Sequence, residues 1–529
     1  TDSSPVMDPR GMNLWEEEDN GYSPIAEYFR DKVVLLTGAT GFIGKIYVEK
    51  LIRCGASELI LIIREKRGVP PAERMTRIFD SVPVMKSFQR NFNNCRDRVK
   101  VVRGDMSEDG LGLDPADVEY IRQRVQITLH VAADVRFDET LFKAIQMNVK
   151  GTWEMLNLCA SGCPRLEMFV YISTAYANCL QGTVHEQFYE PPMDPMVLLN
   201  LVNKMDAVEQ DHFEALTQMI LGPWPNTYTY AKALAESLVK RFYERIPVMI
   251  IRPPIVVATF NEPVQGWVDN LYGMNGAIVG IGCGVLRVIQ TGPDDMKNDV
   301  MPADFVVNGT LAAIKYTVDR NALEAPSTDP DRVAIYHVTS SVDNPLTNAR
   351  FRSMVETIGG DHAPLNSLWI GTCINLQSRL LVRLLTIVFH VIPGIFIDAG
   401  LKYYGKKTSL MKIYRKVARF TGFINYFATH EFIFVNDKMH RVLETMTPGD
   451  REKFHCDIRT VTWEDVFNVY VPGLKLYMRH EGPETWIASR ERFYRLKKIG
   501  LGLFYVTLAM VVYWVLPSLL AEYVPAIYD

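Results

Sequence analysis

The stretch VVLLTGATGFIGK, residues 33–45, decides the fold expected for this chain. It begins with a short apolar run, which is typical of a strand buried in a parallel sheet. The spacing Gly38-x-x-Gly41-x-x-Gly44 then predicts a tight turn that leads into a helix at Phe42. Glycines allow the turn and a close approach of backbone to pyrophosphate, and the helix N-terminus favours phosphate. The same pattern also occurs in a plain strand–turn–helix crossover that binds no nucleotide. The residues after the next strand distinguish this crossover from a dinucleotide-binding turn.

The end of the second predicted strand, LILII at 59–63, indicates which cofactor binds. Arg64 stands twenty positions beyond Gly44, where a dinucleotide fold places its ribose-reading residue. An acidic residue there would accept the 2′-hydroxyl of NAD, whereas a guanidinium holds a 2′-phosphate through two parallel hydrogen bonds. Because Lys66 and Arg67 follow closely, we expect NADPH; the alternative is a solvated basic loop.

Length and composition restrict the class of protein. A chain of 529 residues is too long for one core, and 48% hydrophobic with 22% charged residues fits a globular protein with some membrane affinity. The formal net charge of −4 argues against a nucleic-acid partner. The eight cysteines contain no C-x-x-C pair, so neither a metal site nor a disulfide framework is expected, and a reduced, cytosol-facing environment follows.

Three further predicted strands line the cofactor site. VKVVRGD ends at Asp105, which either contacts the adenine amino group or caps the next loop. ITLHVAAD, residues 127–134, ends in small alanines that let a cofactor lie close, and its histidine is read as a core residue. PVMIIRPPIV, residues 247–256, is another buried strand. Strands and helices that alternate in this way predict a doubly wound parallel sheet.

Hydroxyls and a tyrosine–lysine pair predict the reacting groups. Ser173 and Thr174 end the strand FVYISTAY, at the edge where parallel sheets bind substrates. Capping is the alternative role for such hydroxyls, above all for Ser173, and Thr174 is the stronger candidate. In NTYTYAKALAE, Tyr228 and Lys232 are spaced i, i+4 and share one helix face. A cation beside a phenol lowers the phenol pKa from about 10, which makes the tyrosine a usable acid. Taken alone, the spacing also fits a surface helix pair.

The candidate site residues form two sets. The catalytic set is Tyr228, Lys232, Thr174 and Ser173. The NADPH-binding set shares Tyr228 and Lys232 and adds Thr37, Gly38, Thr40, Gly41, Phe42, Ile43, Gly44, Arg64, Arg67, Asp105, Met106, Ala132, Ala133, Arg252 and Pro253.

These motifs together resemble the extended short-chain dehydrogenases/reductases, and more narrowly the alcohol-forming fatty acyl-CoA reductases. The resemblance rests also on LIIREKRG (61–68), GDMSEDGLGL (104–113), HVAADVRFDE (130–139), EPVQGWVDNLYGMNG (262–276) and DVMPADFVVN (299–308). It covers nearly all of the first 340 residues in order. The chain departs from the family at Pro254, where a small serine is usual, and at Ala231, where threonine is common.

The resemblance implies that two NADPH reduce a long-chain acyl-CoA to a primary alcohol through an aldehyde. Other readings stay open: release of the aldehyde, a sterol or sugar-nucleotide reductase or epimerase, and a non-catalytic lipid-binding member. A homo-oligomer is also left open.

The predicted architecture is a Rossmann domain with an extra substrate region, followed by a helical domain and a membrane anchor. The expected boundaries are an N-terminal arm at 1–30, the NADPH-binding domain at 31–345, the family's C-terminal "male sterility" domain at 365–480 and an anchor at 499–520. The glycine-rich stretch 266–284 is read as loops. The apolar stretch 380–396 is short for a helix that spans a bilayer, so it is read as a buried or interfacial helix covering the acyl channel rather than as a span.

The tail predicts contact with a membrane. Residues 499–520 carry no charge and have the length of about 20 residues that crosses a bilayer, behind a cluster of arginines and lysines. The positive flank predicts a cytosolic catalytic body. By resemblance the endoplasmic reticulum membrane is expected, with the peroxisomal membrane as the alternative.

Overall fold

The computed structural model describes residues 21–85, 95–323 and 333–523, and most side chains beyond residue 506 lie outside the description. Residues 1–20 of the predicted N-terminal arm therefore lie outside the described residues. The chain forms two compact units: the first contains Thr1–Asn270, Gly292–Ala349 and Phe423–Gly473, and the second contains Leu271–Thr291, Arg350–Gly422 and Leu474–Asp529. The domain boundaries expected from the sequence stay predictions.

The first unit is built around one seven-stranded sheet. Its order is β12-β7-β5-β4-β1-β2-β3, and every pair is parallel. The strands are β1 (Val33–Thr37), β2 (Glu58–Ile63), β3 (Val99–Arg103), β4 (Ile127–His130), β5 (Met168–Ile172), β7 (Val248–Arg252) and β12 (Ile335–His337). The order reverses direction between β1 and β4, so the predicted doubly wound sheet is confirmed and its ligand crevice lies beyond the carboxyl ends of these two strands.

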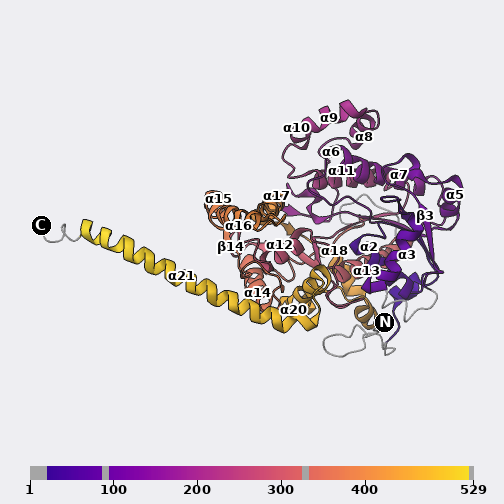
Figure 1. Cartoon of the computed structure of the whole chain (residues 1–529). Helices are drawn as coiled ribbons and strands as arrows, with labels where there is room; N and C mark the ends of the chain where they lie inside the picture. Colours follow the sequence, from indigo (N-terminus) through magenta and orange to yellow (C-terminus); the bar gives the residue numbers. More distant parts are fainter. Residues whose placement is uncertain (1–20, 86–94, 324–332, 524–529) are drawn as a thin grey trace. The chain divides into compact units, whose positions relative to one another are not determined.

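Helices cover both faces of this sheet (Figure 1). One face carries α5 (Pro115–Arg124), α7 (Gly151–Ala160) and α11 (Thr227–Phe242), and the other carries α2 (Phe42–Arg53) and α13 (Ala303–Leu323). Burial on both faces explains why the strands are apolar almost throughout.

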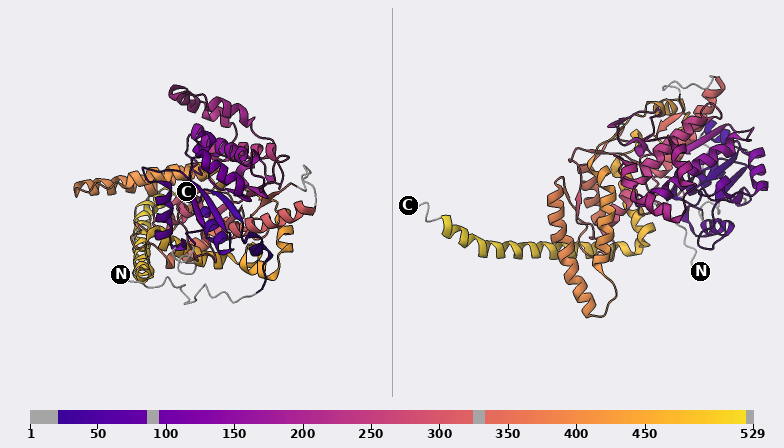
Figure 2. Two further views of the ribbon diagram at one scale, coloured as in Figure 1. Left: turned by 90° about the vertical axis from the view of Figure 1, so that its right-hand side faces the viewer. Right: turned by 90° about the horizontal axis from the view of Figure 1, so that it is seen from above.

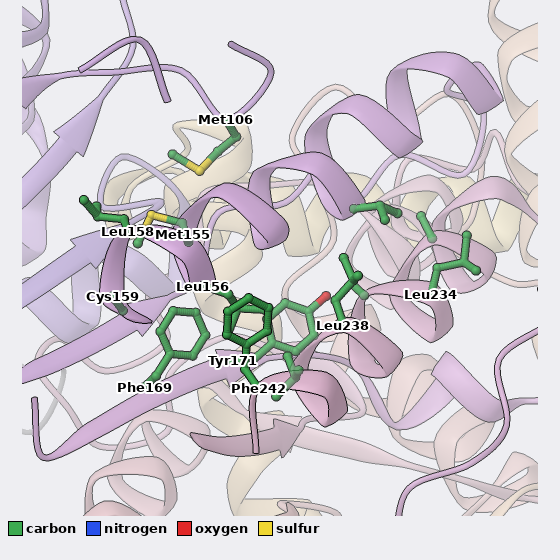
Figure 3. Close-up of a cluster of buried hydrophobic side chains, with 14 of the residues drawn as sticks. Met106, Met155, Leu156, Leu158, Cys159, Phe169, Tyr171, Leu234, Leu238 and Phe242 are labelled. Atoms are coloured by element: carbon green, nitrogen blue, oxygen red, sulfur yellow. The ribbon is translucent and has the colours of Figure 1, made fainter. Parts of the chain in front are cut away.

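The core under α7 and α11 fixes the strand that carries the predicted hydroxyls (Figure 3). Phe169 and Tyr171 of β5 pack in one buried cluster with Leu156 of α7 and Leu238 of α11. The cluster fixes the end of β5 against α11. The position of Thr174 relative to Tyr228 is therefore set by packing rather than by a loop.

The remaining elements of the first unit lie around the sheet. They are α1 (Pro24–Phe29), α3 (Pro71–Ser81), η1 (Asp109–Gly112), α6 (Leu141–Ala144), η2 (Ile145–Lys150), η3 (Ala175–Asn178), β6 (Thr183–Val184), α8 (Pro195–Val202), α9 (Ala207–Ala215), α10 (Thr217–Leu221), β8 (Ile255–Val257), β10 (Lys297–Asn298), β11 (Val300–Pro302), β13 (Leu346–Thr347), β15 (Ile433–Phe434), α18 (Asp437–Thr445), α19 (Pro448–Lys453), η5 (Ile458–Thr460) and α20 (Trp463–Gly473).

The second unit is mostly helical. It contains α12 (Gly273–Gly282), β9 (Val288–Gln290), α14 (Asn348–Asp361), β14 (Ile374–Leu376), α15 (Arg379–Thr386), η4 (Ile387–Val391), α16 (Ile392–Tyr403), most of α17 (Leu410–Thr429), η6 (Leu474–Met478), η7 (Pro483–Thr485) and α21 (Trp486–Tyr523). The glycine-rich stretch read as loops thus contains a helix. Glycine is needed there because a Cβ at Gly276 would lie 2.4 Å from the carbonyl oxygen of Leu271.

The apolar stretch near residue 390 forms one arm of a helical hairpin with α17 (Figure 2, right). Gly394 packs against Tyr414, and Asp398 accepts hydrogen bonds from the backbone of Leu410 and the hydroxyl of Ser409. Of the two roles expected for this arm, burial is wrong, because most of its leucines and isoleucines are exposed. Within the described residues, Arg379–Tyr403 is the one helix long and apolar enough to cross a membrane.

Candidate active site

The glycine turn after β1 is shaped to receive a pyrophosphate. Gly38 has φ +76°, and a Cβ there would lie 2.7 Å from the backbone nitrogen of Ala132. A Cβ at Gly44 would lie 2.1 Å from the carbonyl oxygen of Gly38. Gly41 is the N-cap of α2, and no side chain caps this helix end. The backbone N–H groups of Phe42 and Ile43 at this end suit an anion.

Thr37 joins the ends of β1 and β4 on the two sides of the crevice. Its hydroxyl oxygen accepts hydrogen bonds from the backbone nitrogens of Val131 and Ala132, both at 3.1 Å. It also bonds Nδ1 of His130 at 2.8 Å, and Nε2 of that ring lies 3.1 Å from the hydroxyl of Thr152. The predicted core role of His130 fits this contact, and burial lowers its pKa to about 3. The half-buried alanines at 132 and 133 then line the crevice.

A group of cations gathers beyond the end of β2. Arg74 of α3 donates from Nη1 to the carbonyl oxygen of Arg64 at 2.6 Å and from Nη2 to the hydroxyl of Thr40 at 3.1 Å. Arg67 is exposed in the turn that follows. Burial and the neighbouring arginines lower the pKa of Lys66, so the positive charges are crowded together. Such crowding favours an anion of high charge.

The two candidate residues after β3 differ in position: Asp105 lies in the loop, and the side chain of Met106 lies in the core. The carboxylate of Asp105 accepts from the backbone and hydroxyl of Ser107 at 3.0 and 2.8 Å, and its other oxygen lies 3.6 Å from Arg64. The side chain of Met106 lies in the core cluster and is 5% exposed (Figure 3). Only the backbone of Met106 is therefore left to face a cofactor.

Tyr228 and Thr174 are brought together at the carboxyl end of β5. Asn226 starts α11 by accepting a hydrogen bond from the backbone of Thr229 at 2.9 Å, so Tyr228 lies in the first turn of the helix. Burial raises the pKa of Tyr228 above its ordinary value, and the hydrogen bond with Thr174 opposes the rise. The expected lowering of the phenol pKa by lysine is therefore wrong for this structure. The phenol keeps its proton at neutral pH, as a proton donor must.

Lys232 lies one turn further along α11 and is 2% exposed. Its Nζ donates to the carbonyl oxygen of Ile172 at 2.7 Å and lies 4.6 Å from the centre of the Tyr171 ring. Burial lowers the lysine pKa to about 7, and the negative charge of Glu236 opposes this. The amine is thus held at the end of β5 in a state that is partly charged near neutral pH.

Ser173 and Arg252 meet at a buried carboxylate rather than in the crevice. Ser173 donates to Glu236 at 2.6 Å, and Arg252 donates to both oxygens of the same carboxylate at 2.9 and 2.7 Å. Arg252 is fully buried, and its guanidinium also bonds the carbonyl oxygens at 185 and 187 and Nε2 of His337. The carbonyl oxygen of Pro253 accepts from the backbone nitrogen of Ala175 at 2.9 Å. These groups support the strand ends that carry Thr174.

Sequence reasoning missed Arg74 and Glu236. The second carried a signal, because it continues the i, i+4 series of Tyr228 and Lys232 on the same helix face. Arg74 carried none, since its approach to Arg64 depends on how α3 packs after the turn.

A glycine turn at the switch point of the sheet, with a tyrosine and a lysine on one helix beside the end of β5, defines a Rossmann-fold reductase that uses a nicotinamide cofactor. Two family models match the chain, both described as "Male sterility protein": one covers residues 36–310 and is NAD-binding, and the other covers 389–481. The chain belongs to the fatty acyl-CoA reductase family. It is 36% identical to "Fatty acyl-CoA reductase wat" of Drosophila melanogaster over 93% of each chain. It is 31% identical to "Fatty acyl-CoA reductase 1" of Homo sapiens over 93% of this chain and 92% of that one.

Solved structures support the fold alone. The reductase domain of a nonribosomal peptide synthetase from Mycobacterium tuberculosis aligns with a TM-score of 0.56 at 19% identity, over 85% of this chain and 92% of that chain. The terminal reductase domain of the myxalamid pathway aligns with a TM-score of 0.53 at 17% identity, over 86% and 92%.

Proposed function

We propose that this protein reduces long-chain fatty acyl-CoA to a primary fatty alcohol with NADPH and releases CoA. The observation that carries the proposal is the convergence of Thr174, Tyr228 and Lys232 at the end of β5, beside the glycine turn of the same compact unit. Membership of the family supplies the substrate class.

The residues act on the carbonyl oxygen of the substrate. Thr174 and Tyr228 donate hydrogen bonds to it, and these preorganised donors stabilise the negative charge that develops as the carbonyl is reduced. Bound NADPH would supply a hydride for the thioester carbon, and a second NADPH would supply one for the aldehyde. Tyr228 gives its proton to the oxygen in each half-reaction. The hydroxyl of the tetrahedral thiohemiacetal returns its proton to Tyr228 as the C–S bond breaks, and the departing sulfur takes a proton from solvent. CoA therefore leaves as a thiol, the aldehyde remains, and Tyr228 is protonated for the second half-reaction.

The phosphate-binding residues favour NADPH over NADH. The glycine turn and the N-terminus of α2 would hold the pyrophosphate, and Lys232 would hold the nicotinamide ribose hydroxyls. Arg64, Arg67 and Arg74 would bind the 2′-phosphate. Asp105 lies 3.6 Å from Arg64, so it orients this guanidinium, and it would contact the adenine amino group of the bound cofactor.

Contact with a membrane fits a substrate that partitions into lipid. We place the catalytic unit on the cytosolic side of the endoplasmic reticulum membrane, with residues 499–520 as the anchor. The exposed apolar face of Arg379–Tyr403 lies on the same bilayer. Lys406, Lys407 and Lys412, all exposed at the turn of the hairpin, face the anionic headgroups.

The variant Tyr228→Phe separates a catalyst from a non-catalytic lipid binder. It removes the proton donor and keeps the ring, so NADPH binding should persist while release of CoA thiol from palmitoyl-CoA falls at least about 100-fold. If Tyr228→Phe lost both NADPH binding and activity, the result would indicate a structural role for the tyrosine. Equal activity in the variant and the native chain would contradict the proposed role.

A further inference from the structure

A connected row of aromatic rings begins at Tyr228. The Phe137 ring stacks beside it, with centroids 5.9 Å apart and planes 27° apart. The Phe427 ring lies 5.5 Å from Phe137 and meets Tyr176 edge-on at 5.2 Å. Phe137 follows β4, and Tyr176 stands two residues after Thr174. Phe427 therefore connects the two loops that leave the sheet at the site of reaction.

The segment that carries Phe427 is held firmly against these loops. The hydroxyl of Tyr426 donates to the carbonyl oxygen of Cys179 at 3.2 Å, and β15 pairs in parallel with β6. Phe432 and Phe434 anchor the segment from behind and are 8% and 0% exposed. All of these residues belong to the first compact unit, although the segment lies within the second family match.

Phe137 and the two rings connected to it differ in burial from the anchoring rings Phe432 and Phe434. Phe137, Tyr176 and Phe427 remain half-buried, so the protein leaves part of the surface of each residue uncovered. When Thr174 and Tyr228 bind the substrate carbonyl oxygen, the methylenes next to that carbonyl would lie close to these rings. Apolar rings at that point also exclude the water that would hydrate an aldehyde.

We propose that Phe137, Tyr176 and Phe427 form the wall that binds the first methylenes of the acyl chain and retains the aldehyde between the two reductions. The inference rests on the proposed function and deepens it, because it assigns a substrate contact to a residue of the second family region. The wall determines how much aldehyde escapes before the second hydride arrives.

The test measures aldehyde and alcohol from the full-length chain with NADPH and palmitoyl-CoA. Phe427→Ala removes the ring that joins the two loops. If this exposes one methylene of the bound acyl chain, the enzyme should bind the aldehyde about four-fold more weakly. The ratio of hexadecanal to hexadecanol should therefore rise at least about four-fold. Phe137→Leu should raise the ratio in the same direction and covers the case in which Phe427→Ala fails to fold.

Two control variants separate the wall from simple packing. Phe423→Ala changes an exposed ring one turn earlier on α17 and should leave the ratio as in the native chain. Phe432→Leu weakens the anchor, so it should lower the melting temperature without changing the ratio. An unchanged aldehyde-to-alcohol ratio in folded Phe427→Ala or Phe137→Leu would contradict the proposed wall. An equal rise of the ratio in Phe432→Leu would contradict it as well. If the native chain itself releases neither CoA thiol nor alcohol, the proposed function fails, and the wall fails with it.

Discussion

Lys232 donates a hydrogen bond from Nζ to the carbonyl oxygen of Ile172 at 2.7 Å, in a site that excludes solvent. Because burial lowers its pKa to about 7, keeping the ammonium charged below that pH costs stability. The unfolded chain holds this proton up to about pH 10.5, so the cost is full below pH 7 and declines as pH rises from 7 toward 10.

We therefore predict that Lys232→Met raises the melting temperature while it abolishes turnover. The gain should be largest at or below pH 7 and shrink toward pH 9. Thermal unfolding of both chains from pH 6 to 9 measures this, with alcohol formation followed in parallel. A variant that is less stable than the native chain at pH 6 would show that the ammonium stabilises the fold.

Arg74 should control the choice between NADPH and NADH. Arg74→Ala removes one charged donor from the cation group, and such a bond is worth about 1.5–3 kcal/mol, or roughly 10- to 140-fold in affinity. The dissociation constant for NADPH should rise by that factor while the constant for NADH stays unchanged. Arg77→Ala is the matched control, since Arg77 is exposed on the same helix and pairs with Glu73. Equal weakening of both cofactors would mean that Arg74 acts only on the turn.

Removal of the Glu236 carboxylate should destabilise the fold. Glu236→Gln leaves the guanidinium of Arg252, which is 0% exposed, without its ionic partner. Breaking a buried pair in this way costs about 3–5 kcal/mol. Arg241→Ala breaks an exposed pair with Asp194 instead and should cost less than about 1 kcal/mol. Unfolding midpoints of the two variants give the comparison, and similar small losses would disprove the structural role of Glu236.

The exposed arm of the helical hairpin should enter the lipid interface. An environment-sensitive fluorophore attached at Leu384→Cys or Phe396→Cys in the full-length chain should shift to the blue in vesicles and be quenched by brominated lipid. Met219→Cys is the control, because Met219 is a comparably exposed apolar residue of the first unit. Equal emission spectra at all three positions would show that this helix does not enter the lipid interface.

The sequence predicted those features that depend on local pattern. The glycine turn, the parallel strands and the spacing of Tyr228 and Lys232 are each set by neighbouring residues, and the sheet order confirms the fold they indicate. Arg64 and Asp105 also lie where strand ends placed them, 3.6 Å apart.

Features that depend on packing between distant segments could not be predicted from the sequence. The approach of Phe427 to Phe137 joins regions far apart in the chain, and no periodicity records it. The raised pKa of Tyr228 follows from burial, which a motif does not report. The glycine-rich stretch contains a helix in which Gly276 permits a close backbone contact, whereas the number of glycines predicted loops.

Product stoichiometry from the purified full-length chain tests the central claim most directly. With palmitoyl-CoA and excess NADPH, we predict that two NADPH are oxidised for each CoA thiol released and that one hexadecanol forms. One NADPH per thiol with hexadecanal as the final product, or no thiol at all, would contradict the account.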